Sequence, residues 1–137
     1  ISNYYNMRWV GINVIFLIII SCTYSTEQFK EGKRLFDVHC SGCHGHGAEG
    51  LNQLYPALKD VPFISSIKNQ LPCIIRKGIH NAETFTYKTR HGDMEMPENN
   101  ILNAIQICNI LNYANSQWWH SEPYALKDIE LILENCK

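Results

Sequence analysis

The residues best suited to chemistry are two cysteines and a histidine that lie within five positions of one another. The chain reads CSGCH from Cys40 to His44, the CxxCH spacing associated with covalent attachment of haem. Two thiols three positions apart can bond to the two vinyl groups of one haem, and the adjacent imidazole then lies where it can bind the iron. Ser41 and Gly42 are small and allow the tight turn between the thiols. The spacing predicts one haem c attached at Cys40 and Cys43, with His44 as the proximal iron ligand.

Two other kinds of site also use the CxxC spacing, a structural zinc site and a thioredoxin-like thiol pair. Zinc normally takes four ligands, and no second CxxC follows, because Cys73, Cys108 and Cys136 are single and far apart. A thioredoxin-like pair is expected near a βαβ pattern, which the chain does not show. The residues therefore favour haem attachment.

A haem iron that only carries electrons needs a second axial ligand. A thioether raises the reduction potential relative to two imidazoles, and Met94 and Met96 both lie in the polar segment GDMEMPENN. Filling gaps in a core is the commonest use of methionine, but the polar neighbours argue against that use here. The remaining histidines are rival ligands in principle and are expected to be surface residues: His39, His46, His80, His91 and His120.

Helices must position these groups. A first helix is predicted from a Ser25 cap to His39, with an apolar face formed by Phe29, Leu35 and Phe36. A glycine inside a helix costs about 1 kcal/mol relative to alanine, so Gly32 predicts a close crossing with another helix. The partner is expected in the segment after Asn99.

Further helices are predicted along the rest of the chain. The segment 101–114 has helical spacing, with a predicted buried face at positions 101, 104, 105, 108 and 111. Two short helices, 62–69 and 72–77, each begin at a proline, and a last amphipathic helix covers 125–135. The polar stretch 78–96 lacks helical period and predicts a ligand-bearing loop over the haem.

The N-terminal residues have the features of an export signal. Arg8 precedes an apolar run of 12 residues, Trp9 to Ile20, shorter than the ~20 that a membrane-spanning helix needs. The run ends in Ser21 and Cys22, like a bacterial lipoprotein signal in which the cysteine is acylated; an ordinary cleavage site near Cys22 is the alternative. Met7 is the expected start. The protein is expected to be exported to the periplasmic side of a bacterial membrane and anchored there by lipid at Cys22.

These motifs together resemble those of small class I cytochromes c, over about Phe29 to Trp119. In that family a helix with a glycine and an aromatic residue leads into CxxCHG, as Gly32 and Phe36 lead into CSGCHG. The resemblance implies an all-α cytochrome c fold, with three to five helices wrapped around one covalently attached haem. It also implies that Tyr113 lies against Gly32.

The resemblance also implies roles for two residues near the iron. The segment LYPAL at 54–58 resembles the family's PxL segment, whose proline carbonyl accepts a hydrogen bond from the proximal imidazole, and this role falls on Pro56. The family's ligand methionine is commonly followed by proline. This favours Met96, which precedes Pro97, over Met94 as the distal ligand.

The domain organisation follows from these assignments. Residues 1–21 are expected to be upstream residues and signal peptide, and 22–137 one cytochrome c domain with a helical extension from about 121. Three cysteines remain, with three possible pairings. A bridge between Cys108 and Cys136 would tie the last helix to the preceding one, and buried free thiols are the alternative.

Composition and charge limit the function classes. A formal net charge of -1 provides no basic face for nucleic acid. The expected function is a single-electron carrier in a respiratory chain, not an enzyme. The resemblance implies redox partners such as a respiratory complex and a terminal oxidase or reductase. The alternatives are a haem-based small-molecule sensor or enzyme with an exchangeable sixth ligand, and an electron-transfer subunit of a membrane-associated dehydrogenase.

Overall fold

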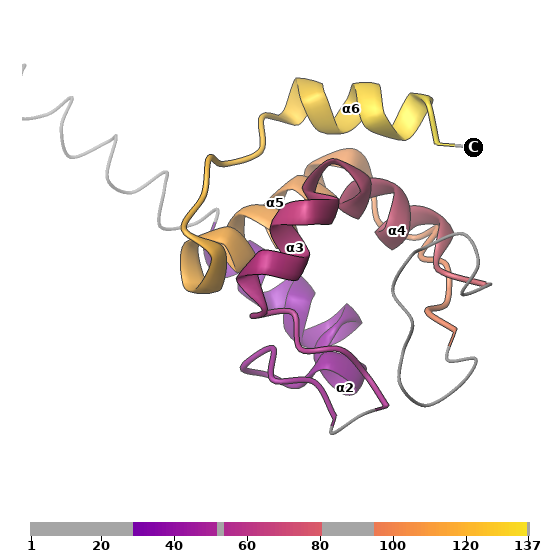
Figure 1. The fold of residues 1–137 in the computed structure, drawn as a ribbon. Helices are drawn as coiled ribbons and strands as arrows, with labels where there is room; N and C mark the ends of the chain where they lie inside the picture. The colour runs from indigo at the N-terminus through magenta and orange to yellow at the C-terminus, as the bar shows by residue number, and fades with distance from the viewer. Residues whose placement is uncertain (1–28, 52–53, 81–94, 137) are drawn as a thin grey trace, which may run out of the picture.

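The fold is all-α, as predicted, in the computed structural model, which describes residues 29–51, 54–80 and 95–136. The predicted export signal, Cys22, Met94, His91 and most of the predicted loop lie outside the described residues. Figure 1 shows the helices arranged around α5. In chain order they are the helical segment 29–39, α2 (Ser41–His44), α3 (Val61–Ile67), the 3-10 turn η1 (Lys68–Gln70), α4 (Leu71–Lys77), α5 (Ala104–Ala114), the π-helical turn η2 (Asn115–Trp119) and α6 (Leu126–Glu134). None of the helices in these ranges is long and apolar enough to span a bilayer.

The predicted close crossing at Gly32 is confirmed. A Cβ placed on Gly32 would lie 2.3 Å from the backbone oxygen of Asn109 and 2.7 Å from the Cβ of Tyr113. Both contacts come from α5, so only a glycine allows the segment 29–39 to approach α5 this closely. The same contacts confirm that Tyr113 lies against Gly32.

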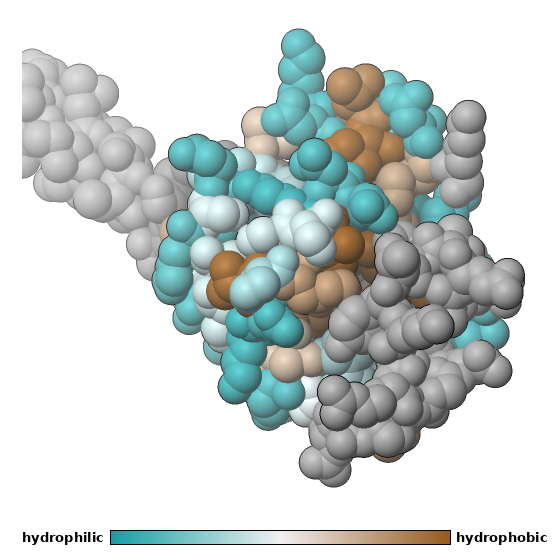
Figure 2. Space-filling model, viewed as in Figure 1, coloured by the Kyte–Doolittle hydropathy of each residue, from teal (hydrophilic) through white to brown (hydrophobic). Residues whose placement is uncertain are grey.

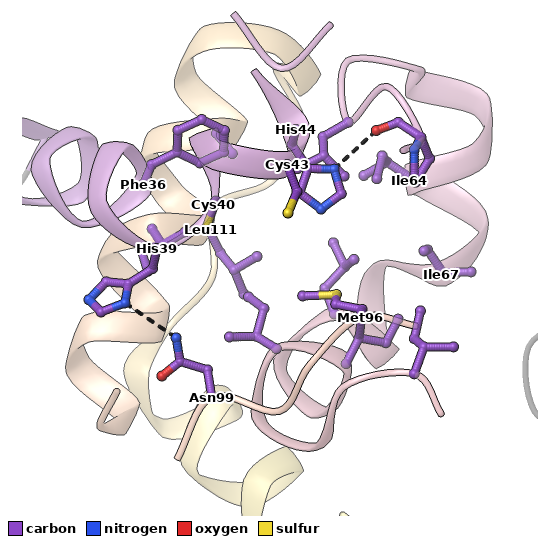
Figure 3. A pocket seen from close by; sticks show the side chains of 18 of the residues that line it. Phe36, His39, Cys40, Cys43, His44, Ile64, Ile67, Met96, Asn99 and Leu111 are labelled. Atoms are coloured by element: carbon purple, nitrogen blue, oxygen red, sulfur yellow. Dashed lines mark hydrogen bonds between the residues drawn. The ribbon is translucent and has the colours of Figure 1, made fainter. Parts of the chain in front are cut away.

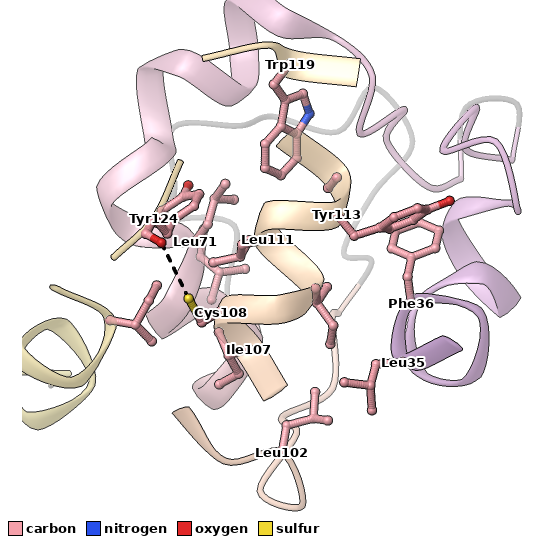
Figure 4. Packing of buried hydrophobic residues seen from close by; sticks show 14 of the residues in the cluster. Leu35, Phe36, Leu71, Leu102, Ile107, Cys108, Leu111, Tyr113, Trp119 and Tyr124 are labelled. Carbon is pink, nitrogen blue, oxygen red and sulfur yellow. Dashed lines mark hydrogen bonds between the residues drawn. The ribbon is translucent and has the colours of Figure 1, made fainter. Parts of the chain in front are cut away.

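The core between these two helices is aromatic. Phe36 is buried, and its ring centre lies 5.9 Å from that of Tyr113 and 5.2 Å from that of Trp118. Figure 4 shows Phe36 and Tyr113 side by side, with Leu35 below them. The predicted apolar face is correct for Leu35 and Phe36 but wrong for Phe29, which is 41% exposed and lies at the outer end of the described helix.

Helix α5 begins later than predicted and buries a different face. Asn103 and Gln106 form a capping box, in which each side chain accepts a hydrogen bond from the other's backbone N–H at 2.9 Å. Ile101 lies before this cap and is 83% exposed, and Ile105 in the first turn is 56% exposed. The predicted face is therefore wrong at both positions. Later turns of α5 are buried on several sides because other helices surround them.

The short helices α3 and α4 confirm two predicted elements, with small shifts of their ends. Each has a proline at its first or second position, where a missing backbone N–H costs nothing. Helix α4 ends at Gly78, which has a φ of 70°. A Cβ on Gly78 would lie 2.2 Å from the backbone oxygen of Met96, so the chain around Met96 passes directly against this glycine.

The last helix, α6, lies across α4 and α5 (Figure 1). Ile129 is fully buried beneath it, whereas Leu131 is 59% exposed, and Figure 2 shows apolar atoms reaching the surface over this helix. The predicted Cys108–Cys136 bridge is wrong: Cys136 is bonded to Cys73 of α4. Cys108 is a buried free thiol whose Sγ lies 3.5 Å from the carbonyl oxygen of Tyr124. The segment before α6 therefore covers Cys108, and the far end of α6 reaches α4 instead.

Candidate functional site

The CxxCH motif forms a short helical turn, α2, directly after the segment 29–39. The N–H of Cys40 donates to the carbonyl of Phe36 at 2.9 Å, and the N–H of His44 donates to the carbonyl of Cys40 at 3.0 Å. The hydroxyl of Ser41 donates to the carbonyl of Asp37 at 2.7 Å and ties the turn to the preceding helix. The helical turn places both thiols and the imidazole of His44 on the lining of one cavity.

The cavity is apolar. Figure 3 shows it between α2, α3, α4 and α5, with Ile64 and Ile67 on one side and Leu111 on the other. Its walls include many further aliphatic and aromatic residues: Phe36, Leu58, Phe63, Leu71, Ile74, Ile75, Ile79, Leu102, Ile110, Ala114 and Trp119. A cavity of this kind suits a large, flat and mostly apolar cofactor better than a polar substrate.

The imidazole of His44 is oriented by one hydrogen bond. Its Nδ1 lies 3.1 Å from the carbonyl oxygen of Pro56, as the resemblance implied. A carbonyl can only accept, so Nδ1 carries the proton and Nε2 keeps its lone pair. Burial lowers the pKa of His44, and the bond to Pro56 partly offsets that shift. At neutral pH His44 is therefore a neutral imidazole with one nitrogen free to bind a metal.

Trp119 supports the segment that carries Pro56. Its indole N–H donates to the carbonyl of Leu58 at 2.7 Å, two residues beyond Pro56. The indole also lines the cavity and is buried. This contact could not be predicted from the sequence. The sequence shows only that two tryptophans, Trp118 and Trp119, follow a helical segment. This pattern does not indicate that the indole of Trp119 would bind the carbonyl of Leu58.

Met96 enters the same cavity from the wall opposite His44, as Figure 3 shows. Its backbone is fixed by an antiparallel bridge to Ile79. The N–H of Ile79 donates to the carbonyl of Met96 at 2.8 Å, and the N–H of Met96 donates to the carbonyl of Ile79 at 3.0 Å. The structure thus brings together Cys40, Cys43, His44 and Met96, the predicted haem-contacting residues.

The other histidines are placed differently. His46 is 80% exposed, with its Nδ1 3.2 Å from a carboxylate oxygen of Asp37. His39 lines the cavity at its edge, and its Nδ1 lies 3.4 Å from the amide nitrogen of Asn99. This contact links the CxxCH turn to the segment after Met96 and was not anticipated. His80 and His120 are exposed.

The two motif thiols differ in environment. Cys40 is half-buried, and burial raises the pKa of its thiol to about 12, with a further contribution from Cys43. Cys43 is exposed. Before attachment, Cys40 is therefore protonated at neutral pH. Within the described ranges, no group of three or more His, Cys, Asp or Glu side chains is arranged to hold a metal ion.

One side-chain nitrogen of Arg76 is buried among the residues that the structure describes. This nitrogen, Nε, has no hydrogen-bond partner among the described residues, and the neighbouring Ile75 lines the cavity although Arg76 itself does not. A buried guanidinium nitrogen without an acceptor suits an anionic group supplied by a ligand. Haem is apolar over most of its surface and carries two carboxylates. The apolar cavity and the paired thiols therefore fit this cofactor.

A helical domain with a CxxCH turn against an apolar cavity defines a c-type haem protein. The family model described as Cytochrome c matches residues 29–118, more than half of the chain, and the chain belongs to the cytochrome c family. This family binds covalently attached haem c with its iron and serves in haem-based electron transfer, and Cys40 and Cys43 fit its attachment motif. Cytochrome c domains are generally exported. No curated protein is significantly similar in sequence to this chain.

Proposed function

We propose that this protein is a class I cytochrome c that carries single electrons between partner proteins in a respiratory chain and has no substrate chemistry of its own. The bound haem supplies a one-electron iron couple. The observation that carries the proposal is that His44 and Met96 enter one apolar cavity from opposite walls (Figure 3). With His44 and Met96 both bound to the iron, no iron position would be left for a substrate.

The residues of the cavity have distinct roles in this proposal. Cys40 and Cys43 hold the haem by thioethers, so that it is not lost. The carbonyl of Pro56 fixes the ring of His44 and increases its basicity as a ligand. The thioether of Met96 raises the reduction potential relative to a second imidazole. The apolar walls exclude water from the iron.

Arg76 is the proposed partner of a haem carboxylate. The support is its buried Nε, which lacks an acceptor among the described residues. An Arg76→Leu variant should load less haem or hold it with a lower reduction potential, since one positive charge near the iron is lost. An Arg76→Lys variant should restore part of the effect, because it keeps the charge.

The proposed location is the periplasmic side of a bacterial membrane, with Met7 as the start, cleavage after residue 21 and a lipid on Cys22. This rests on the sequence pattern alone, because these residues lie outside the described ranges. Mass spectrometry of the purified protein should find a diacylglyceryl group on Cys22. An unmodified Cys22 at the mature N-terminus would rule out the anchor.

The proposed partners are a respiratory complex on one side and a terminal oxidase or reductase on the other. Local ion pairs on the segment 29–39 bear on how such partners are steered. Lys33 pairs with Asp37, and Arg34 pairs with Glu31. These two basic residues are therefore partly neutralised by their own helix, and the segment contributes less positive charge to a docking face than the sequence suggests.

Carbon monoxide binding to the ferrous protein at neutral pH tests the proposed function. A carrier with Met96 on the iron should bind little carbon monoxide, and only slowly, because the thioether must leave first. Rapid and complete binding would instead indicate a sensor or enzyme with an exchangeable sixth position. Co-purification with a dehydrogenase in fixed proportion would show that the protein is a permanent subunit.

A further inference from the structure

We infer that the Cys73–Cys136 disulfide positions Met96 through α4 and thereby keeps this ligand in the cavity. The inference rests on the proposed function, in which Met96 binds the haem iron. The disulfide lies outside the cavity, and residues 119–137, which supply Cys136, lie beyond the region that the cytochrome c family model matches.

Helix α4 is held on two faces, one that lines the cavity and one that carries the disulfide. Leu71, Ile74 and Ile75 line the cavity. Cys73 lies on another face of the same helix and is bonded to Cys136, which follows the end of α6. The helix is only seven residues long, so its own hydrogen bonds contribute little to holding it in place. Its position depends on what each face contacts.

The end of α4 holds the segment around Met96. The N–H of Asn99 donates to the carbonyl of Ile75 at 3.2 Å, and Ile79 exchanges two backbone hydrogen bonds with Met96. Gly78 lets the end of α4 and the segment around Met96 approach so closely that a Cβ at this position would overlap the backbone oxygen of Met96. A displacement of α4 would therefore move the backbone of Met96 with it.

The other end of the disulfide is fixed to the body of the protein. Asn112 of α5 holds Tyr124, just before α6, by two hydrogen bonds: Nδ2 donates to the Tyr124 carbonyl at 2.9 Å, and Oδ1 accepts from the Tyr124 N–H at 2.8 Å. Ile129 of α6 is fully buried. Cys136 is thus attached to an anchored helix, and the disulfide connects α4 to a fixed point rather than to a loose tail.

Opening of the sixth position should therefore become easier when the disulfide is absent. Carbon monoxide can bind ferrous haem only while Met96 is away from the iron, so its binding rate reports how often this ligand leaves. We expect a Cys73→Ser/Cys136→Ser variant to bind carbon monoxide about tenfold faster than the wild type. A tenfold change corresponds to about 1.4 kcal/mol.

The matched control is Cys108→Ser, whose hydroxyl can still donate to the Tyr124 carbonyl before α6. It also removes a sulfur from the same domain, but Cys108 is a free buried thiol on α5 that takes no part in the disulfide. Loss of overall stability would speed carbon monoxide binding in both variants alike. The inference requires a clear increase in the double variant and little change in the control. Equal rates in the double variant and the wild type would overturn it.

A second measurement covers the case in which the double variant does not load haem. Ferrous wild-type protein is treated with a phosphine, which converts the disulfide to two thiols and is itself oxidised to the phosphine oxide. The haem is already reduced, the phosphine is removed by desalting before carbon monoxide is added because it can itself bind ferrous iron, and mass spectrometry after alkylation confirms two new thiols. Carbon monoxide should bind about tenfold faster after treatment, and an unchanged rate would overturn the inference.

A Met96→Ala variant separates this inference from the proposed function. If Met96 is the ligand, that variant binds carbon monoxide rapidly whether or not the disulfide is intact. If Met96→Ala leaves the slow binding of the wild type unchanged, the proposed ligand is wrong and the inference fails with it. If Met96→Ala binds rapidly but removal of the disulfide has no effect, only the inference fails.

Discussion

The indole of Trp119 donates a hydrogen bond to the carbonyl of Leu58, and this contact connects the end of the central helix to the segment that orients the proximal histidine. Leu58 lies two residues from Pro56, whose carbonyl accepts from Nδ1 of His44. Trp119 lies one residue beyond the stretch that the family model matches. The protein thus uses a residue outside that stretch to support its proximal side.

A Trp119→Phe variant should lower the free energy of unfolding of the holoprotein by about 1 to 2 kcal/mol. It loses one buried hydrogen bond, leaves the Leu58 carbonyl unsatisfied and fills less space. Chemical denaturation followed by circular dichroism measures the change. Trp118→Phe is the control, because the Trp118 indole N–H has no hydrogen-bond partner among the described residues. A loss for Trp118→Phe as large as that for Trp119→Phe would contradict this account.

A Met96→Ala variant should lose the weak charge-transfer band of the ferric haem near the red edge of the visible spectrum. Its reduction potential should also fall, because the thioether ligand stabilises the ferrous iron. An optical redox titration gives both results. Met94→Ala is the control and should keep the band and the potential. If Met94→Ala alone abolished the band, the assignment of the distal ligand would be wrong.

A Gly32→Ala variant should be destabilised by about 1 to 3 kcal/mol. The new methyl group would overlap the backbone of Asn109 and the Cβ of Tyr113 and force the two helices apart. Val38→Ala is the control, since Val38 lies on the same helix as Gly32 and is 65% exposed. Thermal unfolding of both holoproteins measures the difference. The close crossing would be unimportant if the two variants melted at the same temperature.

Tyr124 should make the stability of the protein depend on alkaline pH. Burial raises the pKa of its phenol, whose hydroxyl donates to the carbonyl of Lys68 at 3.0 Å. The unfolded chain therefore ionises first, at a pH of about 10. The stabilisation is fully present below that pH and is lost as the pH rises toward the folded-state pKa.

A Tyr124→Phe variant tests this pH dependence. At pH 7 it should be less stable than the wild type by about 1 kcal/mol, because the hydrogen bond to Lys68 is missing. At about pH 11 the difference should shrink or disappear. Ionisation of Tyr124 then stabilises the unfolded state of the wild type, and the variant has no phenol at this position to ionise. Urea unfolding at both pH values gives the comparison. A difference that stays constant would show that the phenol does not titrate as described.

The local features of the site could be predicted from the sequence because they depend on residues close together in the chain. The CxxCH spacing requires a tight turn, and α2 has one. Gly32 is costly within a helix unless another helix comes close, and α5 does so. Pro62 and Pro72 mark the first turns of α3 and α4.

The features that could not be predicted depend on which elements meet in space. Helical periodicity indicated a single buried face on α5, but neighbours on several sides shift burial toward Ile107, Ile110 and Leu111 and leave Ile105 exposed. A Cys108–Cys136 bridge is one of three possible pairings of the remaining cysteines, and the order of the helices favours it because the helix of Cys108 precedes α6 in sequence. The direction of α6 brings Cys136 to α4 instead, and no local pattern encodes that direction.

An optical redox titration of the wild-type holoprotein tests the central claim most directly. We expect one covalently bound haem per chain and a single one-electron transition. The red-edge band of the ferric protein should disappear in step with reduction, because the same iron is bound by His44 and Met96. A ferric spectrum without that band, together with a potential typical of an iron that lacks a thioether ligand, would contradict the account.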